Sequence, residues 1–188
     1  MVPSWSHIVP WNDSAPPTGK RPCACDSPGG WATRLPYAVA SHFAPADLDV
    51  ALRLYRERFQ PPAGLEKPSV IVGLSVSAAP TDEEARHLFT STRQTFVNLC
   101  AGRPGPLPPP VDDVAALCPP ELQPLLDEVL ARMVVGSPDT VASGLAAFEQ
   151  HTSADEISVA SKFFDQRLRV RSLEIIAQAA ASVFAAAA

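Results

Sequence analysis

The sequence predicts an α/β fold built around a parallel sheet, and three observations support this. The stretch Val70–Ala78 is rich in β-branched residues and nearly unbroken in apolarity, as expected of a strand covered on both faces. Pro80 ends that strand, and Thr81 and Glu84 have the spacing of a capping box that starts a helix. Apolar strand patterns also precede helical patterns elsewhere in the chain. Alternation of strands with helices is typical of α/β proteins.

The first expected strand covers residues 35–41 and leads into a helix. Pro45 suits the first helical position, and the apolar stripe that follows it ends near Phe59. The helix after the central strand carries a stripe that we expect to pack back onto the sheet. The stripe consists of Ala85, Leu88, Phe89, Thr92, Phe96 and Leu99. Further helices are predicted over 121–133 and after Ser137, followed by a third strand at 155–161 and a last helix from Asp165.

The start of the helix at Ser137 has two interpretations. Ser137 suits an N-cap, Pro138 the first helical position and Asp139 the positive end of the helix dipole. The free backbone amides at such a start can also bind a phosphate. Since no glycine-rich loop accompanies this stretch, an ordinary cap is the favoured interpretation.

Residues 102–113 contain so much proline that they favour extended polyproline II over helix or sheet. We expect this segment to cross the surface as a stiff excursion or a flap over the active site. The alternative is a ligand for an SH3-like groove, which would make the chain a proline-rich adaptor.

Length and composition limit the function classes. The chain of 188 residues suits one domain plus a tail, and its 46% hydrophobic and 19% charged residues are typical of globular proteins. A net charge of -5 without a basic run argues against nucleic-acid binding. The most apolar windows fall short of the roughly 20 residues that span a membrane. The start of the sequence lacks the features of a signal peptide, so the expected location is the cytoplasm.

Residues 1–30 differ from the rest, and we expect an irregular, proline-rich leader before a domain at 31–188. Tryptophans in this region, Trp5, Trp11 and Trp31, suit either a binding platform or local packing, and local packing is favoured. The cysteines are Cys23, Cys25, Cys100 and Cys118. Because no second closely spaced pair follows the C-x-C, we expect reduced thiols and no metal site.

Candidate site residues follow from the rule that parallel sheets place their sites at the carboxyl ends of strands. The residues in question are Ser41, His42, Phe43, Ser77, Ala78, Ser161, Lys162 and Phe163. His42 is the best candidate for an acid, a base or an orienting hydrogen-bond partner, with a structural role as the alternative. The nucleophile elbow, the phosphate-binding loops and the H-E-x-x-H zinc motif are all absent from the sequence.

Several stretches, taken in order, resemble the C-terminal part of the luciferase-like flavin-dependent monooxygenases. These are L-P-Y-A-V-A-S-H-F-A-P-A at 35–46, T-D-E-E-A-R at 81–86, G-R-P-G-P-L-P-P-P at 102–110, V-G-S-P-D-T-V at 135–141 and A-D-E-I-S-V at 154–159. The resemblance covers residues 35–178. It implies a (β/α)8 TIM barrel, of which this chain would hold the last three strands, the sixth to the eighth, with their helices.

The same resemblance implies oxidation of a small organic substrate with O2 and reduced FMN, or use of a deazaflavin in relatives. His42 would orient the substrate or an oxygen adduct of the flavin, and Ser41, Phe43 and Ser161 would line the cofactor pocket. A flavin reductase is the implied protein partner. No nucleic-acid or membrane partner is expected.

Residues 23–30 depart from the family pattern, in which a fifth-strand loop and basic residues face the flavin phosphate. A full barrel takes about 250 residues. We therefore expect a truncated barrel that binds flavin weakly and whose activity is doubtful. Three strands cannot close a barrel and leave open edges. The alternative function is thus a non-catalytic half-barrel that associates through those edges, with itself or with a longer relative.

Overall fold

The computed structural model describes residues 36–41, 47–61, 66–113 and 118–184. The predicted leader at 1–30, the three tryptophans, Cys23 and Cys25 lie outside these ranges. In chain order the elements are β1 (Tyr37–Val39), α1 (Leu48–Arg58), β2 (Val70–Ala78), α2 (Asp82–Cys100), the 3-10 helix η3 (Pro120–Leu122), α3 (Gln123–Leu130), β3 (Val134–Gly136), α4 (Pro138–Thr152), β4 (Glu156–Ala160) and α5 (Gln166–Phe184).

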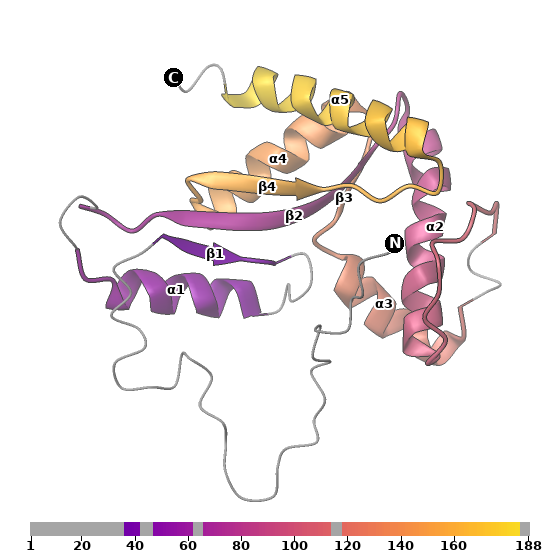
Figure 1. Ribbon diagram of the computed structural model, residues 1–188, viewed down its shortest axis with the longest axis horizontal. Coiled ribbons are helices and arrows are strands. Elements are labelled where there is room, and N and C mark those ends of the chain that lie inside the picture. Colours follow the sequence, from indigo (N-terminus) through magenta and orange to yellow (C-terminus); the bar gives the residue numbers. More distant parts are fainter. Residues whose placement is uncertain (1–35, 42–46, 62–65, 114–117, 185–188) are drawn as a thin grey trace, which may run out of the picture.

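Strand β2 is the centre of a four-stranded parallel sheet. It pairs with β1 over residues 70–72, with β4 over residues 71–75 and with β3 over residues 76–78. Figure 1 shows the long β2 ribbon with β1 and β4 beside it. The predicted parallel α/β sheet is therefore confirmed, and the predicted strands at 35–41 and 155–161 correspond to β1 and β4.

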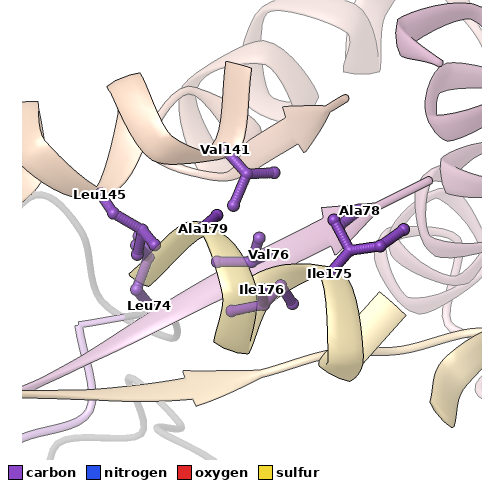
Figure 2. Packing of buried hydrophobic residues seen from close by; sticks show 8 residues of the cluster. All are labelled: Leu74, Val76, Ala78, Val141, Leu145, Ile175, Ile176 and Ala179. Carbon is purple, nitrogen blue, oxygen red and sulfur yellow. The ribbon is translucent and has the colours of Figure 1, made fainter. Parts of the chain in front are cut away.

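One face of β2 is covered by helices. Val70 and Val72 pack against Leu48, Leu52 and Tyr55 of α1. Further along the same face, β2 meets α4 and α5 in a cluster made by Leu74, Val76, Ala78, Val141, Leu145, Ile175, Ile176 and Ala179 (Figure 2). Since side chains alternate along a strand, the even-numbered residues of β2 form the buried core. Each fully buried aliphatic side chain of this kind stabilises the fold by about 1.5–3 kcal/mol.

The turn from α4 to β4 is fixed at the amino end of the sheet. Ser153 ends α4 in a left-handed conformation with φ of 45°. Arg56 of α1 donates hydrogen bonds to the carbonyl oxygens of Thr152 and Ser153, at 2.5 and 2.8 Å. Asp155 then exchanges two bonds with Val70, because its carboxylate accepts from the Val70 amide at 2.8 Å and its own amide donates to the Val70 carbonyl at 2.9 Å.

The expected packing of α2 on the sheet is confirmed in part, since α2 contacts β2 and β3 while Leu99 at the end of its stripe is exposed. Its helix forms and Thr81 caps it, with the Thr81 hydroxyl accepting from the Glu84 amide at 3.2 Å. Helix α2 lies at the carboxyl end of the sheet (Figure 1). It is not part of the helix layer that α1, α4 and α5 form over β2. Its Val97 packs with Cys118 and Leu126 in a separate small cluster. The even-numbered side chains of β2 are covered by α1, α4 and α5.

A short strand, β3, was not expected from the sequence. The helix predicted over 121–133 is a 3-10 turn followed by α3, which ends at Leu130. The chain then extends, and Val134–Gly136 pairs with the last residues of β2. Three residues are too few to show a strand period, so the pairing arises from the partner strand rather than from a local pattern.

The proline-rich segment runs alongside α2. Gln94 donates a side-chain hydrogen bond to the Pro109 carbonyl at 2.8 Å, and the Thr90 hydroxyl accepts from the Val111 amide at 2.9 Å. No helix or strand is assigned to residues 102–113, as the composition predicted. These bonds favour the stiff excursion, while a flap or an SH3-type ligand remains a prediction.

The core of Figure 2 can be tested on α5. Ile176→Ala removes a side chain that is 5% exposed and leaves a cavity, so we expect a loss of about 2–5 kcal/mol in the free energy of unfolding. Leu173→Ala on the same helix is the control, since Leu173 is 40% exposed and should cost about 0.5 kcal/mol. Urea unfolding measures both variants. Equal losses would contradict the packing.

Candidate functional site

The face of β2 that points away from α1, α4 and α5 becomes small and polar toward its carboxyl end. Its residues are Ile71, Gly73, Ser75 and Ser77, which alternate with the core residues. Toward the carboxyl end this face therefore presents a glycine and two hydroxyls. Helix α2 lies across the strand ends (Figure 1), and side chains of this size leave a small cavity between it and β2.

Two small cavities lie on either side of Ser75. The first is lined by Ser41, Gly73, Leu74, Ser75, Val129, Arg132, Met133 and Phe148. The second is lined by Ser75, Ser77, Phe89, Thr92, Met133, Ala160 and Lys162. In this structure each has room for about one water molecule. Ser75 and Met133 contribute to both cavities, so the two are neighbours near the carboxyl end of β2.

Ser41 lies at the end of β1, where the sequence predicted it. Its side chain is buried, and its hydroxyl donates a hydrogen bond to the Gly73 carbonyl of β2. This bond holds Ser41, the second residue after β1, against β2 at the wall of the first cavity. His42 and Phe43, which follow directly, lie outside the described residues, so their predicted roles remain predictions.

Ser161 follows β4 and is also buried, but its hydroxyl lies on the helix side of the sheet. It is 3.1 Å from the Ser172 hydroxyl of α5, which in turn accepts from the Ala78 amide at 3.0 Å. The next residue, Lys162, lines the second cavity. Ser161 thus ties the ends of β4 and β2 to α5, and its predicted contact with a cofactor remains a prediction.

The start of α4 at Ser137 is an ordinary cap, and the phosphate-site alternative is wrong. The Ser137 hydroxyl accepts from the Thr140 amide at 3.5 Å. The Asp82 carboxylate of α2 accepts from the Ser137 amide at 2.6 Å and from the Thr140 hydroxyl at 2.8 Å. A side chain at Gly136 would come within 2.6 Å of that carboxylate. The protein therefore supplies its own anion at this helix start.

Two carboxylates beside the site have lowered pKa values. The backbone amide of Ser137, which donates to Asp82, lowers the pKa of that carboxyl below its ordinary value. A hydrogen bond from Arg132 lowers the pKa of Asp49. Asp49 contacts Arg132 at 2.9 Å and His151 at 2.7 Å. Because Arg132 also lines the first cavity, this ion pair fixes a cationic side chain at the cavity wall.

Three lining residues were missed by reasoning from the sequence. Phe89 and Thr92 belong to α2, and Met133 lies between α3 and β3. The first two belong to the stripe that was expected to pack on the sheet, so they were assigned to the core and not to a site. The available signal was Thr92 itself, because a hydroxyl inside an otherwise apolar stripe indicates that this part of the helix meets a polar surface.

The described ranges hold no cluster of three or more side chains that could bind a metal ion. Cys100 is an exposed free thiol and Cys118 a buried one. Among the helices that the structure describes, none combines the length and apolarity needed to cross a membrane.

Comparison with known proteins places the chain beside oxygenases. No protein-family model matches it. It is 43% identical over 143 residues to the uncharacterized protein YvbT of Bacillus subtilis, covering 76% of this chain and 43% of YvbT. It is 42% identical over 141 residues to a protein of Escherichia coli K12 named luciferase-like monooxygenase, covering 75% of this chain and 42% of that protein. The crystal structure of apo-MsnO8 matches with a TM-score of 0.67 at 32% identity, covering 79% of this chain and 46% of MsnO8. The chain therefore spans less than half the length of these relatives.

The bond between Ser172 and Ala78 gives a stability prediction. Ser172→Ala leaves the buried Ala78 amide and the Ser161 hydroxyl without this partner, so we expect a loss of about 1–3 kcal/mol in the free energy of unfolding. Ser182→Ala, an exposed serine of the same helix that bonds only to its own helix at 2.7 Å, is the control. Chemical denaturation of both variants checks this. A Ser172→Ala variant as stable as the parent would contradict the assigned bond.

The Asp82 bridge predicts a dependence on pH. The folded-state pKa of Asp82 lies below the ordinary 3.8, so its stabilisation is complete above that pH and is lost as the pH falls through the lowered pKa. Asp82→Asn should lower Tm at neutral pH and flatten the decline of Tm on acidification. Glu83→Gln, which removes a charge from the same helical turn, is the control. Parallel Tm curves for Asp82→Asn and the parent would contradict the prediction.

Proposed function

Since this chain belongs with the luciferase-like monooxygenases, we propose that it forms the last three βα units, sixth to eighth, of a (β/α)8 barrel and carries one wall of a flavin-dependent monooxygenase site. The parent reaction is oxidation of a small organic substrate by O2 with reduced flavin. The observation that carries this proposal is the polar carboxyl edge, where Ser75 separates two cavities beside the ends of β1 and β4.

The cofactor proposed is reduced FMN, with a deazaflavin as the alternative. When bound, reduced flavin supplies the electrons that activate oxygen. The small side chains of Gly73 and Ser75 suit a wall that a flat ring approaches closely. Among the residues that line the two cavities the basic ones are Arg132 and Lys162, and Arg132 is paired with Asp49. This supply of positive charge fits weak rather than tight binding of the flavin phosphate.

The residues proposed for the site have distinct roles. His42 orients the substrate by hydrogen bonding, which suits a titratable ring directly after a buried strand. Ser41 and Phe43 line the cofactor pocket at the end of β1. Ser161 lines it at the end of β4 through its main chain, because its hydroxyl is bonded to Ser172. A flavin reductase is the proposed protein partner and the cytoplasm the proposed location.

A second candidate function is an interaction module without catalysis. In the part of the chain that the structure describes, β1 and β4 pair with β2 alone. Ala38, Glu156 and Ser158 are exposed on the face away from the helices. Unpaired parallel edges of this kind favour association with further strands, either of a second copy or of a longer relative. Sedimentation equilibrium tests this, and a stable species at the mass of one chain, 20.0 kDa, would contradict it.

Titration with FMN tests the first function. We expect saturable quenching of flavin fluorescence with a micromolar Kd. His42→Ala should weaken it about tenfold, which corresponds to ~1.4 kcal/mol. His87→Ala, on the exposed side of α2, is the matched control and should bind like the parent. The same titration with a deazaflavin separates the two cofactors. Absence of saturable quenching with both would limit the relationship to ancestry.

A further inference from the structure

Thr92 has a buried hydroxyl that lacks a partner. The residue is 4% exposed, and its Oγ1 makes no hydrogen bond among the described residues. Buried polar side-chain atoms are nearly always bonded, because leaving one unbonded costs stability. Thr92 also lines the second cavity, together with Ser75 and Ser77. A buried hydroxyl without a hydrogen-bond partner beside a small cavity indicates that the cavity holds an atom to which this hydroxyl bonds.

The lining of the second cavity has a polar and an apolar part. Ser75 and Ser77 present hydroxyls from β2, and Lys162 brings a positive charge from the end of β4. Phe89 and Met133 supply the apolar part. Hydroxyl donors near an ammonium group match an anionic oxygen better than a neutral or cationic group.

We propose that this cavity binds the carboxylate of a small organic molecule, with the hydroxyls of Ser77 and Thr92 donating to one of its oxygens. The space, about that of one water molecule, admits one carboxylate oxygen while the rest of the molecule stays outside. The inference rests on the proposed function in one respect, since it identifies the bound molecule as the substrate. Thr92 is then a positioning residue for that substrate, left unbonded when the cavity holds no ligand.

Two neighbours of Thr92 set the limits of this inference. Ser91 Oγ and Arg93 Nε are also buried without a partner among the described residues, but neither residue lines the cavity. Ser91 is therefore a matched control, because it shares the helix, the burial and the unbonded hydroxyl with Thr92. A ligand in the cavity should depend on Thr92 and not on Ser91.

The experiment is an amide NMR titration of the full chain with sodium propionate, and with propionamide as the uncharged probe. We expect saturable shifts at Ser77 and Thr92 with propionate alone. Thr92→Val keeps the shape of the side chain, so it should weaken propionate binding by about tenfold or more without lowering Tm. Ser91→Ala should bind propionate like the parent.

Several outcomes would overturn the proposal. These are no saturable shifts with propionate, equal shifts with propionamide, or unchanged binding by Thr92→Val. A lower Tm for Thr92→Val would indicate a structural hydroxyl and also count against it. If that variant does not fold, Ser77→Ala must show the same loss of binding. Propionate binding without flavin quenching would overturn the monooxygenase proposal and leave the carboxylate site standing, whereas quenching without propionate binding would do the reverse.

Discussion

The burial of β2 is the constraint on which the rest of the structure depends. Its backbone is paired on both sides by parallel strands, and its even-numbered side chains are covered by α1, α4 and α5. Both requirements must be met at once, because an unpaired amide or an uncovered valine in this strand would cost more than a surface contact returns. The helices therefore occupy one face of β2. The opposite face is left to Gly73, Ser75 and Ser77, which line the two cavities together with Leu74 and Phe148 in the first and residues of α2 in the second.

The carboxyl end of the sheet is held by hydrogen bonds and an ion pair between segments that lie far apart in the sequence. Asp82 joins the start of α2 to the start of α4, and Ser172 joins α5 to the end of β2. Asp49, near the start of α1, holds Arg132 at the wall of the first cavity. In each case a helix residue bonds to a segment far away in the sequence, so this end of the sheet is fixed from several sides. This preorganisation is what a binding site needs from its scaffold.

Much of the fold was predictable because its signals are local. The apolar run of β2, the cap at Thr81 and the start of α4 at Ser137 all appear where the sequence predicted them. Ser41 and Lys162 were also predictable as cavity-lining residues, because strand ends can be located from the pattern. The short strand β3, which pairs with the end of β2, was not predictable from the sequence. It is held by β2 through the bonds of residues 76–78 and has no period of its own.

The sequence by itself determined the strands β1, β2 and β4, the helices between and after them, that the sheet is parallel, and the relationship to luciferase-like monooxygenases. The tertiary structure alone decided which helix covers the sheet. An apolar stripe specifies that a face is buried but not what buries it: α4 and α5 pack on the even-numbered side chains of β2, while α2 meets the carboxyl ends of β2 and β3. It also decided which hydroxyls are bonded within the protein, as at Ser161, and which is not, as at Thr92, because bonding depends on neighbours that only folding brings within reach.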